Sequence, residues 1–333
     1  MGGLSSGGLV VGLTGATGHI GGLLLTALAA SPGVAEVRSV ARRPLGRSLA
    51  GLQGARSVHV CADVRDPAAR RALEGVDVLY HLAAQVWQGG GTGGLATMAE
   101  VNVDGTRNIL RARPGAVVVV SSAAVYGAWP DNPLPLGEDH PARPNHECPY
   151  GGHKLLSEAI CAQEHGNWAI VRLAAVLGHH ADARVARAVQ GYRLAVPAVR
   201  GVRQAVQWLD EGDAVGGLQA VGRALAGPGR GVAGEVFNIA PQDWLSAPEA
   251  AAVAASRVVT VPRRALLAGS RLGRRLGITP FGVDRAILIG GPLALSVAKA
   301  NNVLGWRPEQ TSAQVLRDAL ARGWHGLPLN RER

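Results

Sequence analysis

The sequence predicts an α/β fold in which a doubly wound parallel sheet is followed by a smaller, mainly helical C-terminal lobe. Short apolar runs alternate with longer helical patterns over residues 9–173, as in sheets whose strands are joined by crossover helices. Beyond Gly178 the alternation weakens, and prolines at 248, 262, 280 and 292 interrupt it. The 333 residues are 47% hydrophobic, so the chain can fill the core that this fold requires.

The strands and helices of the sheet are expected in alternation. Apolar or β-branched runs predict strands, at residues 9–13, 37–40, 57–61, 76–82, 116–120 and 169–173. Helical spacing predicts the helices that join them, at residues 20–30, 67–73, 97–112 and 149–165. A later strand at residues 235–240 is expected to return to the same sheet.

These elements predict two lobes and two flexible chain termini. Residues 8–177 should form the sheet domain, together with the returning strand near residues 232–241. The second lobe is expected to be discontinuous in sequence, with segments 178–231 and 242–327. The two ends are expected to be flexible, at residues 1–7 and 328–333.

The charge pattern argues against nucleic acid as a partner. The formal net charge is +10, but the basic residues are almost all arginines, with Lys154 and Lys299 as the two lysines. Arginine pairs such as Arg263-Arg264 are scattered and lack the interleaved aromatic residues of a base-stacking surface. We therefore expect a small-molecule substrate and no nucleic-acid partner.

The cysteines and the hydropathy of the chain indicate a cytoplasmic protein. Cys61, Cys148 and Cys161 form no paired motif and have no zinc-ligand spacing, so we predict reduced thiols and no metal site. The N-terminus lacks the basic region of a signal peptide. The longest late apolar stretch, residues 286–297, is too short to span a bilayer. We expect no membrane partner.

The strongest local motif lies between the first strand and the first helix, where residues 14–21 are TGATGHIG. Gly15 permits a tight turn, Gly18 lets the backbone approach a pyrophosphate, and Gly21 allows close helix–strand packing. The N-terminus of the helix offers N–H groups and a positive dipole end to the phosphates. The motif predicts a Rossmann-type dinucleotide site whose contacts are Gly15, Thr17, Gly18, His19, Ile20 and Gly21.

The residues after the next strands bear on the kind of cofactor. An acidic residue after the second strand would favour NAD, but the chain has Arg42 and Arg43 there, placed to meet the 2′-phosphate of NADP. Both are also ordinary surface residues for so arginine-rich a chain, so the preference for NADP over NAD is modest. Asp63 and Val64 are placed to bracket the adenine. Small residues after the fourth strand are expected to lie against the cofactor, namely Leu82, Ala83 and Ala84.

A tyrosine and a lysine four residues apart suggest a catalytic helix face. Tyr150 and Lys154 would lie one turn apart on the same side of a helix. A nearby ammonium favours the phenolate and lowers the pKa of the phenol from about 10, which suits a general acid/base. Ser121 and Ser122 end the strongest β run, at the sheet edge where open α/β folds bind ligands.

Taken together, these motifs resemble the extended short-chain dehydrogenases/reductases of the NAD-dependent epimerase/dehydratase family. The matching segments are residues 14–21, 63–64, 81–84, 101–108, 121–127, 150–154, 172–173 and 304–308. The resemblance implies that Tyr150 is the acid/base and that Lys154 tunes it and holds the nicotinamide ribose. It also implies that Ser122 positions the substrate oxygen and that Asn102 supports a proton-relay water. Ser121, Tyr150 and Lys154 are expected to contact the cofactor, and the second lobe is expected to bind the substrate.

Two departures from the family bear on the reaction. Sugar 4,6-dehydratases of this group carry Asp-Glu after the catalytic Thr, where this chain has Ala123-Ala124, so dehydration is not expected. Nucleotide-sugar epimerases usually have an Asn after the sixth strand, where this chain has Ala174-Ala175, and Asp210 stands where the family usually has a histidine.

The sequence therefore favours an NAD(P)-dependent oxidoreductase that transfers a hydride at a secondary alcohol or ketone. The alternative is a sugar or nucleotide-sugar epimerase, similar to UDP-glucose 4-epimerase, that keeps its cofactor tightly bound. A non-catalytic cofactor-binding scaffold is a third interpretation, which the retained Tyr150 and Lys154 disfavour. A homodimer is expected from the resemblance.

Overall fold

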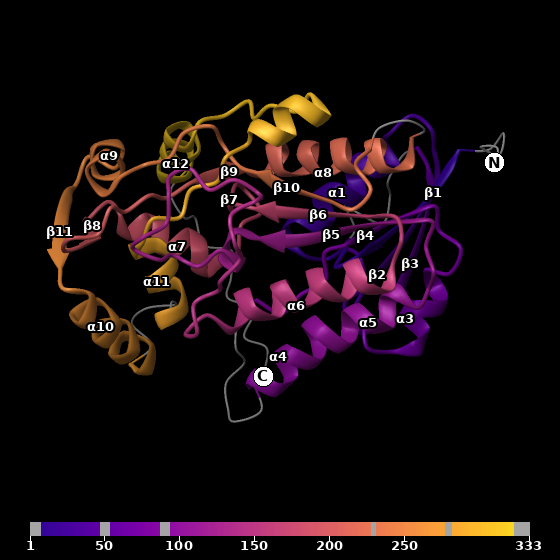
Figure 1. Cartoon of the computed structure of the whole chain (residues 1–333), viewed down its shortest axis with the longest axis horizontal. Helices are drawn as coiled ribbons and strands as arrows, with labels where there is room; N and C mark the ends of the chain where they lie inside the picture. The colour runs from indigo at the N-terminus through magenta and orange to yellow at the C-terminus, as the bar shows by residue number, and fades with distance from the viewer. Residues whose placement is uncertain (1–7, 47–53, 87–93, 228–230, 277–281, 323–333) are drawn as a thin grey trace.

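The computed structural model shows a central sheet with helices on both faces and a second lobe at one end (Figure 1). It describes residues 8–46, 54–86, 94–227, 231–276 and 282–322. The ends predicted to be flexible, residues 1–7 and 328–333, lie outside the described residues.

Seven parallel strands of the described chain form the central sheet, in the order β10-β6-β5-β4-β1-β2-β3. Their bounds are β1 Leu9–Thr14, β2 Val34–Ala41, β3 Arg56–Cys61, β4 Val78–His81, β5 Ala116–Ser122, β6 Trp168–Leu173 and β10 Glu235–Ile239. The order reverses between β1 and β4, the switch point at which open α/β sheets bind ligands. The predicted doubly wound parallel sheet is confirmed.

The strand register brings the carboxyl ends of the central strands to one edge of the sheet. Thr14 at the end of β1 lies opposite both Val40 of β2 and His81 of β4. On the other side of β4, the strand β5 continues to Ser122, which lies opposite Leu173 of β6. The loops that follow β1, β2, β4 and β5 therefore start from the same edge.

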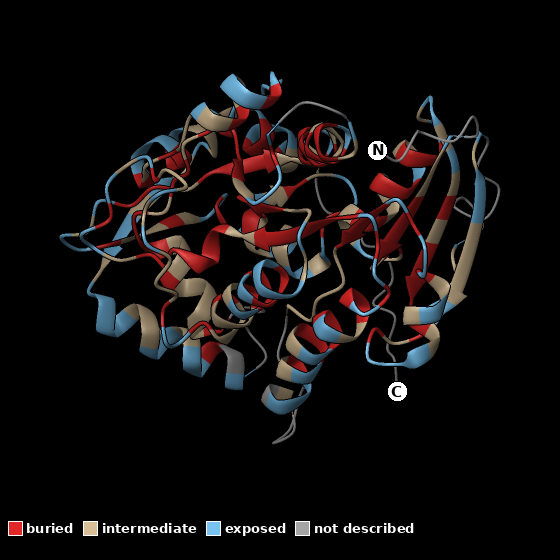
Figure 2. Ribbon diagram, turned by 45° about the vertical axis from the view of Figure 1, so that its right-hand side comes forward, coloured by how far each residue is buried: buried red, intermediate tan, exposed pale blue. Residues whose placement is uncertain are grey.

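Helices cover both faces of the sheet, as Figure 1 shows. They are α1 His19–Ala29 and α8 Glu211–Ala226 on one face, and α3 Pro67–Ala72, α5 Gly105–Leu110 and α6 Pro149–Glu164 on the other. Successive strand residues point to opposite faces, so the valine run of β5 fills both layers. Val118 packs in the cluster of α1 and α8, and Val117 and Val119 pack with Ile160 of α6. The strands lie buried between helices whose outer surfaces are exposed (Figure 2).

The helix predicted over residues 97–112 is interrupted by a π-helical turn. Its parts are α4 Gly94–Ala99, the π turn η1 Glu100–Asp104 and α5. The Thr106 hydroxyl donates to the carbonyl oxygen of Asn102 inside this turn, over 2.7 Å. Such turns often occur at functional sites, and this one contains the predicted catalytic residue Asn102.

The second lobe is mainly helical, as predicted, but it also contains two small pairs of parallel strands, β8 with β11 and β7 with β9. Its elements are β7 Ala175–Leu177, α7 Ala183–Gly191, β8 Ala195–Val199, β9 Trp208–Asp210, α9 Ala247–Val253, β11 Arg257–Val261, α10 Arg263–Arg275, α11 Val283–Gly290 and α12 Ser312–Ala321. Two expected parts of this lobe lie elsewhere. The helix α8 covers the sheet, because Leu218, Val221 and Leu225 pack into the main core, and the π turn η3 Ala300–Leu304 packs into the same core.

The close packing of α8 on the sheet predicts a strong effect of substitution at Gly222. A methyl group there would overlap the buried hydroxyl of Tyr80 on β4, and overpacking of this kind costs about 1–3 kcal/mol. We expect Gly222→Ala to lower the free energy of unfolding by that amount in urea denaturation. Gly216→Ala on the same helix is the control, because a Cβ there comes no closer than 3.6 Å to Trp306. Equal stability of the two variants would contradict this packing.

Candidate active site

The glycine turn after β1 has the tight geometry that its sequence predicts. Gly15 has a φ of 76°, and its N–H donates to the carbonyl of Val40 over 2.9 Å. A side chain at Gly15 would approach the backbone nitrogen of Ala83 to 2.9 Å, and one at Gly21 would overlap the carbonyl oxygen of Gly15. Both positions therefore require glycine.

The start of α1 offers a cradle that fits a pyrophosphate. Gly18 is the exposed N-cap residue of α1 and supplies no side-chain cap to the first turn. A Cβ at Gly18 would meet the Gly15 carbonyl oxygen at 3.1 Å and no other atom within 4 Å. Uncapped helix N–H groups beside an open approach suit the diphosphate of a dinucleotide, so the residues of this turn fit the expected cofactor.

The two arginines after β2 lie beside this turn. Arg43 donates from Nη2 to the carbonyl oxygen of Thr17 over 3.3 Å, and both Arg42 and Arg43 are exposed. Arg42 is also close enough to Asp63 for its charge to contribute to a lowered pKa of that carboxyl group. The pair therefore places positive charge next to the segment expected to bind the adenosine half of the cofactor.

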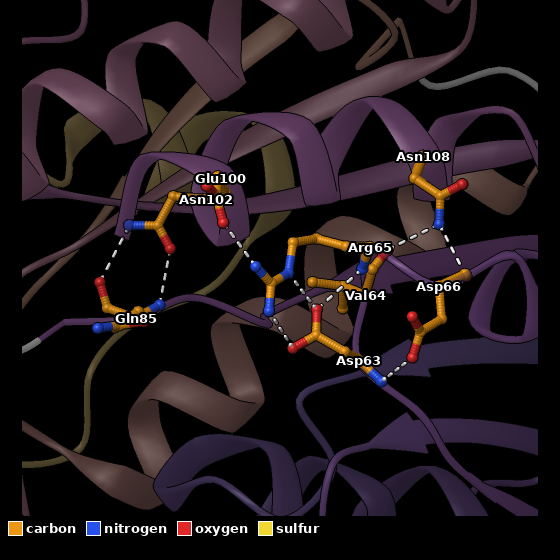
Figure 3. Close-up of polar contacts among 8 residues, drawn as sticks. All are labelled: Asp63, Val64, Arg65, Asp66, Gln85, Glu100, Asn102 and Asn108. Atoms are coloured by element: carbon orange, nitrogen blue, oxygen red, sulfur yellow. Dashed lines mark hydrogen bonds and ion pairs between the residues drawn. The ribbon is translucent and has the colours of Figure 1, made fainter. Parts of the chain in front are cut away.

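The Asp63 carboxylate is engaged by a neighbouring arginine (Figure 3). Arg65 donates to it from Nε over 2.9 Å and from its backbone N–H over 3.0 Å, and also pairs with Glu100 over 2.7 Å. The hydrogen bond from Arg65 is the largest cause of the lowered pKa of Asp63. Asn108 holds the Val64 carbonyl oxygen over 2.8 Å. If the Asp63 carboxylate accepts a hydrogen bond from the adenine, as predicted, it does so with oxygens that also bind Arg65.

A buried polar chain runs from β1 through β4 to the helix α5. The Thr14 hydroxyl lies 2.8 Å from Nδ1 of His81, whose Nε2 lies 3.0 Å from the Thr106 hydroxyl. The Ala83 N–H donates to the Thr14 hydroxyl over 3.2 Å and so fixes the loop after β4. Burial, with a smaller contribution from the Lys154 charge, lowers the pKa of His81 to about 3. His81 is therefore neutral and structural.

Asn102 joins the π turn to the loop after β4 (Figure 3). Its Oδ1 accepts the N–H of Gln85 over 2.7 Å, and its Nδ2 donates to the Gln85 carbonyl oxygen over 3.0 Å. The Asn102 carbonyl oxygen accepts the hydroxyl of Ser157, from α6, over 2.8 Å. Asn102 is thus a fixed, buried link between three segments at the sheet edge; its support of a proton-relay water stays a prediction.

The structure brings Ser122, Tyr150 and Lys154 together at the carboxyl end of β5. The Ser122 side chain lies close enough to the Tyr150 phenol to act against the rise of its pKa. Lys154 lies one helical turn further along α6, where its ammonium donates to the carbonyl of Val120 over 2.7 Å and lies 5.9 Å from the centre of the Tyr150 ring. Ser122 also accepts the N–H of Ala124 over 3.2 Å, which fixes the orientation of its hydroxyl.

The pKa of Tyr150 differs from the expectation. Burial raises the pKa of the Tyr150 phenol to about 12, against the opposing effects of the Arg285 charge and the Ser122 hydrogen bond. Burial likewise lowers the pKa of Lys154 to about 8. The predicted lowering of the phenol pKa by Lys154 is therefore corrected: desolvation dominates, and the cation that acts on the phenol is Arg285.

Arg285 is a site residue that the sequence did not reveal. It comes from α11 of the second lobe, and its guanidinium carbon lies 5.8 Å from the centre of the Tyr150 ring. The chain contains many arginines, and no motif around residue 285 distinguishes this one. Only the docking of α11 beside α6 shows that it faces the phenol.

Ser121 points away from Ser122 into a buried ion-pair network. Its hydroxyl donates to Glu158, which pairs with Arg172 over 2.7 Å. The Arg172 guanidinium in turn lies 4.7 Å from the centre of the Tyr126 ring. The Ser121 hydroxyl is therefore occupied between the sheet and α6, so the expected cofactor contact of Ser121 would have to use its backbone.

A sequence model of the NAD-dependent epimerase/dehydratase family matches residues 11–240 of this chain. The chain belongs to this family. It is 27% identical over 321 residues to an uncharacterized protein of Mycobacterium tuberculosis strain H37Rv, covering 93% of this chain and 82% of that protein. It is 28% identical over 280 residues to a dTDP-glucose 4,6-dehydratase of Streptomyces griseus, covering 73% of this chain and 77% of the dehydratase.

Solved structures share the fold over nearly the whole length of this chain. The dTDP-glucose 4,6-dehydratase DesIV from Streptomyces venezuelae, solved with NAD bound, superposes with a TM-score of 0.70 at 23% identity, covering 95% of this chain and 98% of DesIV. RMD from Pseudomonas aeruginosa, solved with NADPH, gives a TM-score of 0.64 at 22% identity, covering 94% and 98%. Of these two proteins with the same fold, one was solved with NAD and the other with NADPH.

The described residues contain neither a membrane-spanning helix nor a metal-binding cluster. No helix among them is both long and apolar enough to cross a bilayer. No group of three or more histidine, cysteine or acidic side chains within those same ranges is arranged to hold a metal ion.

His19 of the cofactor turn belongs to a hydrogen-bonded cluster around Glu211. Its Nε2 lies 2.8 Å from Glu211 at the start of α8, and Nδ1 of His180 lies 3.0 Å from the same carboxylate. The backbone N–H groups of His179 and His180 donate to it as well, each over 3.1 Å. Burial alone would raise the pKa of Glu211, but these hydrogen bonds hold it at about 2.

The low pKa of Glu211 predicts a stability loss in acid. Its pKa is lower in the folded chain than the value of about 4.3 expected after unfolding, so the stabilisation is complete above that pH and is lost as the pH falls toward 2. A shift of this size corresponds to roughly 3 kcal/mol. We expect Glu211→Gln to lower the melting temperature at neutral pH and to flatten its dependence on pH below about 4.3. Glu164→Gln, at an exposed carboxylate, is the control; identical acid profiles for wild type and Glu211→Gln would refute the role of the cluster.

Proposed function

We propose that this family member is an NAD(P)-dependent oxidoreductase that transfers a hydride at a secondary alcohol or ketone. The observation that carries the proposal is that α6 places Tyr150 and Lys154 one turn apart beside Ser122, at the sheet edge that also carries the glycine turn. A proton donor and a hydroxyl that orients the reacting oxygen are what carbonyl reduction requires of the protein.

In the proposed reaction, Ser122 binds the substrate oxygen and Tyr150 handles its proton. For reduction, the carbonyl carbon gains a hydride and its oxygen takes the proton of the Tyr150 hydroxyl; oxidation is the reverse. The bound nicotinamide supplies or accepts the hydride. A phenol with a pKa of about 12 is protonated at neutral pH, so Tyr150 carries the proton that reduction requires. Lys154, which bonds to β5 beside the phenol, would hold the nicotinamide ribose.

The position of Arg42 and Arg43 supports NADP as the cofactor. Both are exposed next to the glycine turn, and no carboxylate occupies the end of β2. A 2′-phosphate is better matched by two guanidinium groups than a ribose hydroxyl is. Solved structures with this fold bind NAD or NADPH, so the preference rests on the two arginines of this chain.

Dehydration is not proposed. Ala123 and Ala124 lie buried in the short 3₁₀ helix η2, Ala123–Val125, directly after Ser122. They provide no titratable group next to Tyr150, and elimination of water needs a second acid/base. The dehydratase activity named for the Streptomyces griseus relative is therefore not proposed for this chain.

An epimerase remains the second candidate, because the description of the matching family names epimerases. An epimerase oxidises and re-reduces one carbon, so it retains its cofactor and consumes none. Mass spectrometry of freshly purified protein, followed by assays with added NADPH and NADH against ketones and keto-sugars, distinguishes the two. We expect loss of added NADPH in proportion to product. Retained NAD with product formed and no added cofactor consumed would favour the epimerase and contradict the reductase.

Replacement of the phenol tests the acid/base role directly. Tyr150→Phe removes the transferable proton and keeps the ring, so kcat should fall at least about 100-fold while the dissociation constant of NADPH changes little. The matched control is Tyr192→Phe, at a buried tyrosine of the second lobe, which should retain activity. Turnover of Tyr150→Phe near the wild-type rate would remove Tyr150 from the mechanism.

Removal of the two arginines tests the cofactor preference. We expect Arg42→Ala/Arg43→Ala to raise the KM for NADPH roughly tenfold or more, because a charge-assisted phosphate contact is lost, and to leave the KM for NADH nearly unchanged. Arg71→Ala, at another exposed arginine, is the control. Equal effects on both cofactors would show that these arginines do not select the 2′-phosphate.

A further inference from the structure

The helix α10 projects from the tip of the second lobe, beside β11 (Figure 1). It packs against the lobe through one side, where Gly273 is buried and the Leu266 side chain lies next to Gly290 of α11. The α11 helix also carries Arg285, which faces Tyr150. The helix α10 is therefore attached to the part of the lobe that reaches the candidate active site.

The outer side of α10 presents an apolar stripe. Ala265, Ala268, Leu272 and Leu276 are all exposed and follow one another at intervals of three or four residues, so they share one helix face. Leu276 continues the helix, because its N–H donates to the Leu272 carbonyl over 2.9 Å. Leu272 is 59% exposed and Leu276 63% exposed. Two leucines on one stripe thus lie open to solvent.

A basic flank borders this stripe. Arg264, Arg271 and Arg275 are exposed and spaced seven and four residues apart, which places them together along one side of the leucines. They form no ion pair with any acidic residue that the structure describes. The sequence between Glu249 and Asp284 contains six arginines and no acidic residue. Arg263 at the start of α10 pairs with Glu147 over 3.8 Å, but the three arginines beside the stripe have no such partner among the described residues.

The apolar stripe and the basic flank of α10 together indicate which kind of partner binds this face. A second copy of the chain meeting α10 through the same face would bring two stripes with arginines and no carboxylate to pair them. An anionic lipid surface matches both features, since its headgroups pair with the arginines and its acyl boundary accepts the leucines. We propose that α10 binds the surface of an anionic membrane and holds the second lobe against it.

Surface binding of this kind differs from spanning a membrane. The sequence predicts no membrane partner because its longest late apolar stretch is too short to span a bilayer, and no helix of the described residues, α10 included, is long and apolar enough to cross one. A short helix with leucines on one side and arginines beside them lies in the plane of the headgroups. The outer face of α10 is recognised only once its inner face is known to be packed.

Sedimentation with lipid vesicles tests the proposal on the full-length protein. We expect binding to vesicles of phosphatidylglycerol and phosphatidylcholine, little binding to phosphatidylcholine alone, and release by high salt. Leu272→Gln/Leu276→Gln and Arg264→Gln/Arg271→Gln/Arg275→Gln should each weaken binding roughly tenfold or more. Circular dichroism and NADPH binding should stay at wild-type values, because both sets of side chains are exposed.

Matched control variants distinguish binding through α10 from nonspecific binding by exposed apolar side chains or by net charge. Leu194→Gln removes a leucine that is 81% exposed outside α10, and Arg71→Gln/Arg111→Gln/Arg187→Gln removes three exposed arginines elsewhere; both should bind vesicles as the wild type does. Equal weakening by the control sets would assign the binding to net charge and overturn the proposal. Failure of the wild type to bind mixed vesicles would also overturn it, as would light scattering that shows a dimer lost only in the α10 variants.

Discussion

The parallel register of the central strands is the constraint on which the candidate site depends. Because β1 and β4 are paired with Thr14 opposite His81, the glycine turn and the loop after β4 start from the same level. The strand β5 reaches further, to Ser122, and carries its hydroxyl to the same edge. A one-residue slip in either pairing would turn these side chains to the opposite face, and the cofactor turn and the catalytic hydroxyls would no longer share one site.

Burial sets the chemistry of that site as much as charge does. Desolvation disfavours the charged form of any group, so it raises the pKa of Tyr150 to about 12 and lowers those of Lys154 and His81 to about 8 and 3. All three groups are pushed toward their neutral forms. The positive charge of Arg285 acts against this burial effect and lowers the pKa of Tyr150. Because Arg285 comes from the second lobe, the position of that lobe affects the acidity of the phenol.

The sequence predicted the sheet well and the long-range contacts poorly. The valine run of β5 and the glycine turn are local patterns, and the structure has the strands and the turn where those patterns lie. The four-residue spacing of Tyr150 and Lys154 likewise placed both on α6. The π turn at Asn102 and the approach of Arg285 to Tyr150 depend on contacts between distant segments. No local spacing encodes such contacts, and the second lobe, where the alternation of the sequence weakens, contained strand pairs that the pattern did not predict.

The most direct test of the account is a crystal structure of the protein with NADP⁺ bound. The account predicts the pyrophosphate on the N–H groups of α1 beside Gly18, the 2′-phosphate between Arg42 and Arg43, and the nicotinamide ring facing the hydroxyls of Ser122 and Tyr150 with Lys154 on its ribose. A nicotinamide ring held away from Tyr150, or a Tyr150 hydroxyl turned from Ser122 in the complex, would contradict the claim that these groups form one catalytic site.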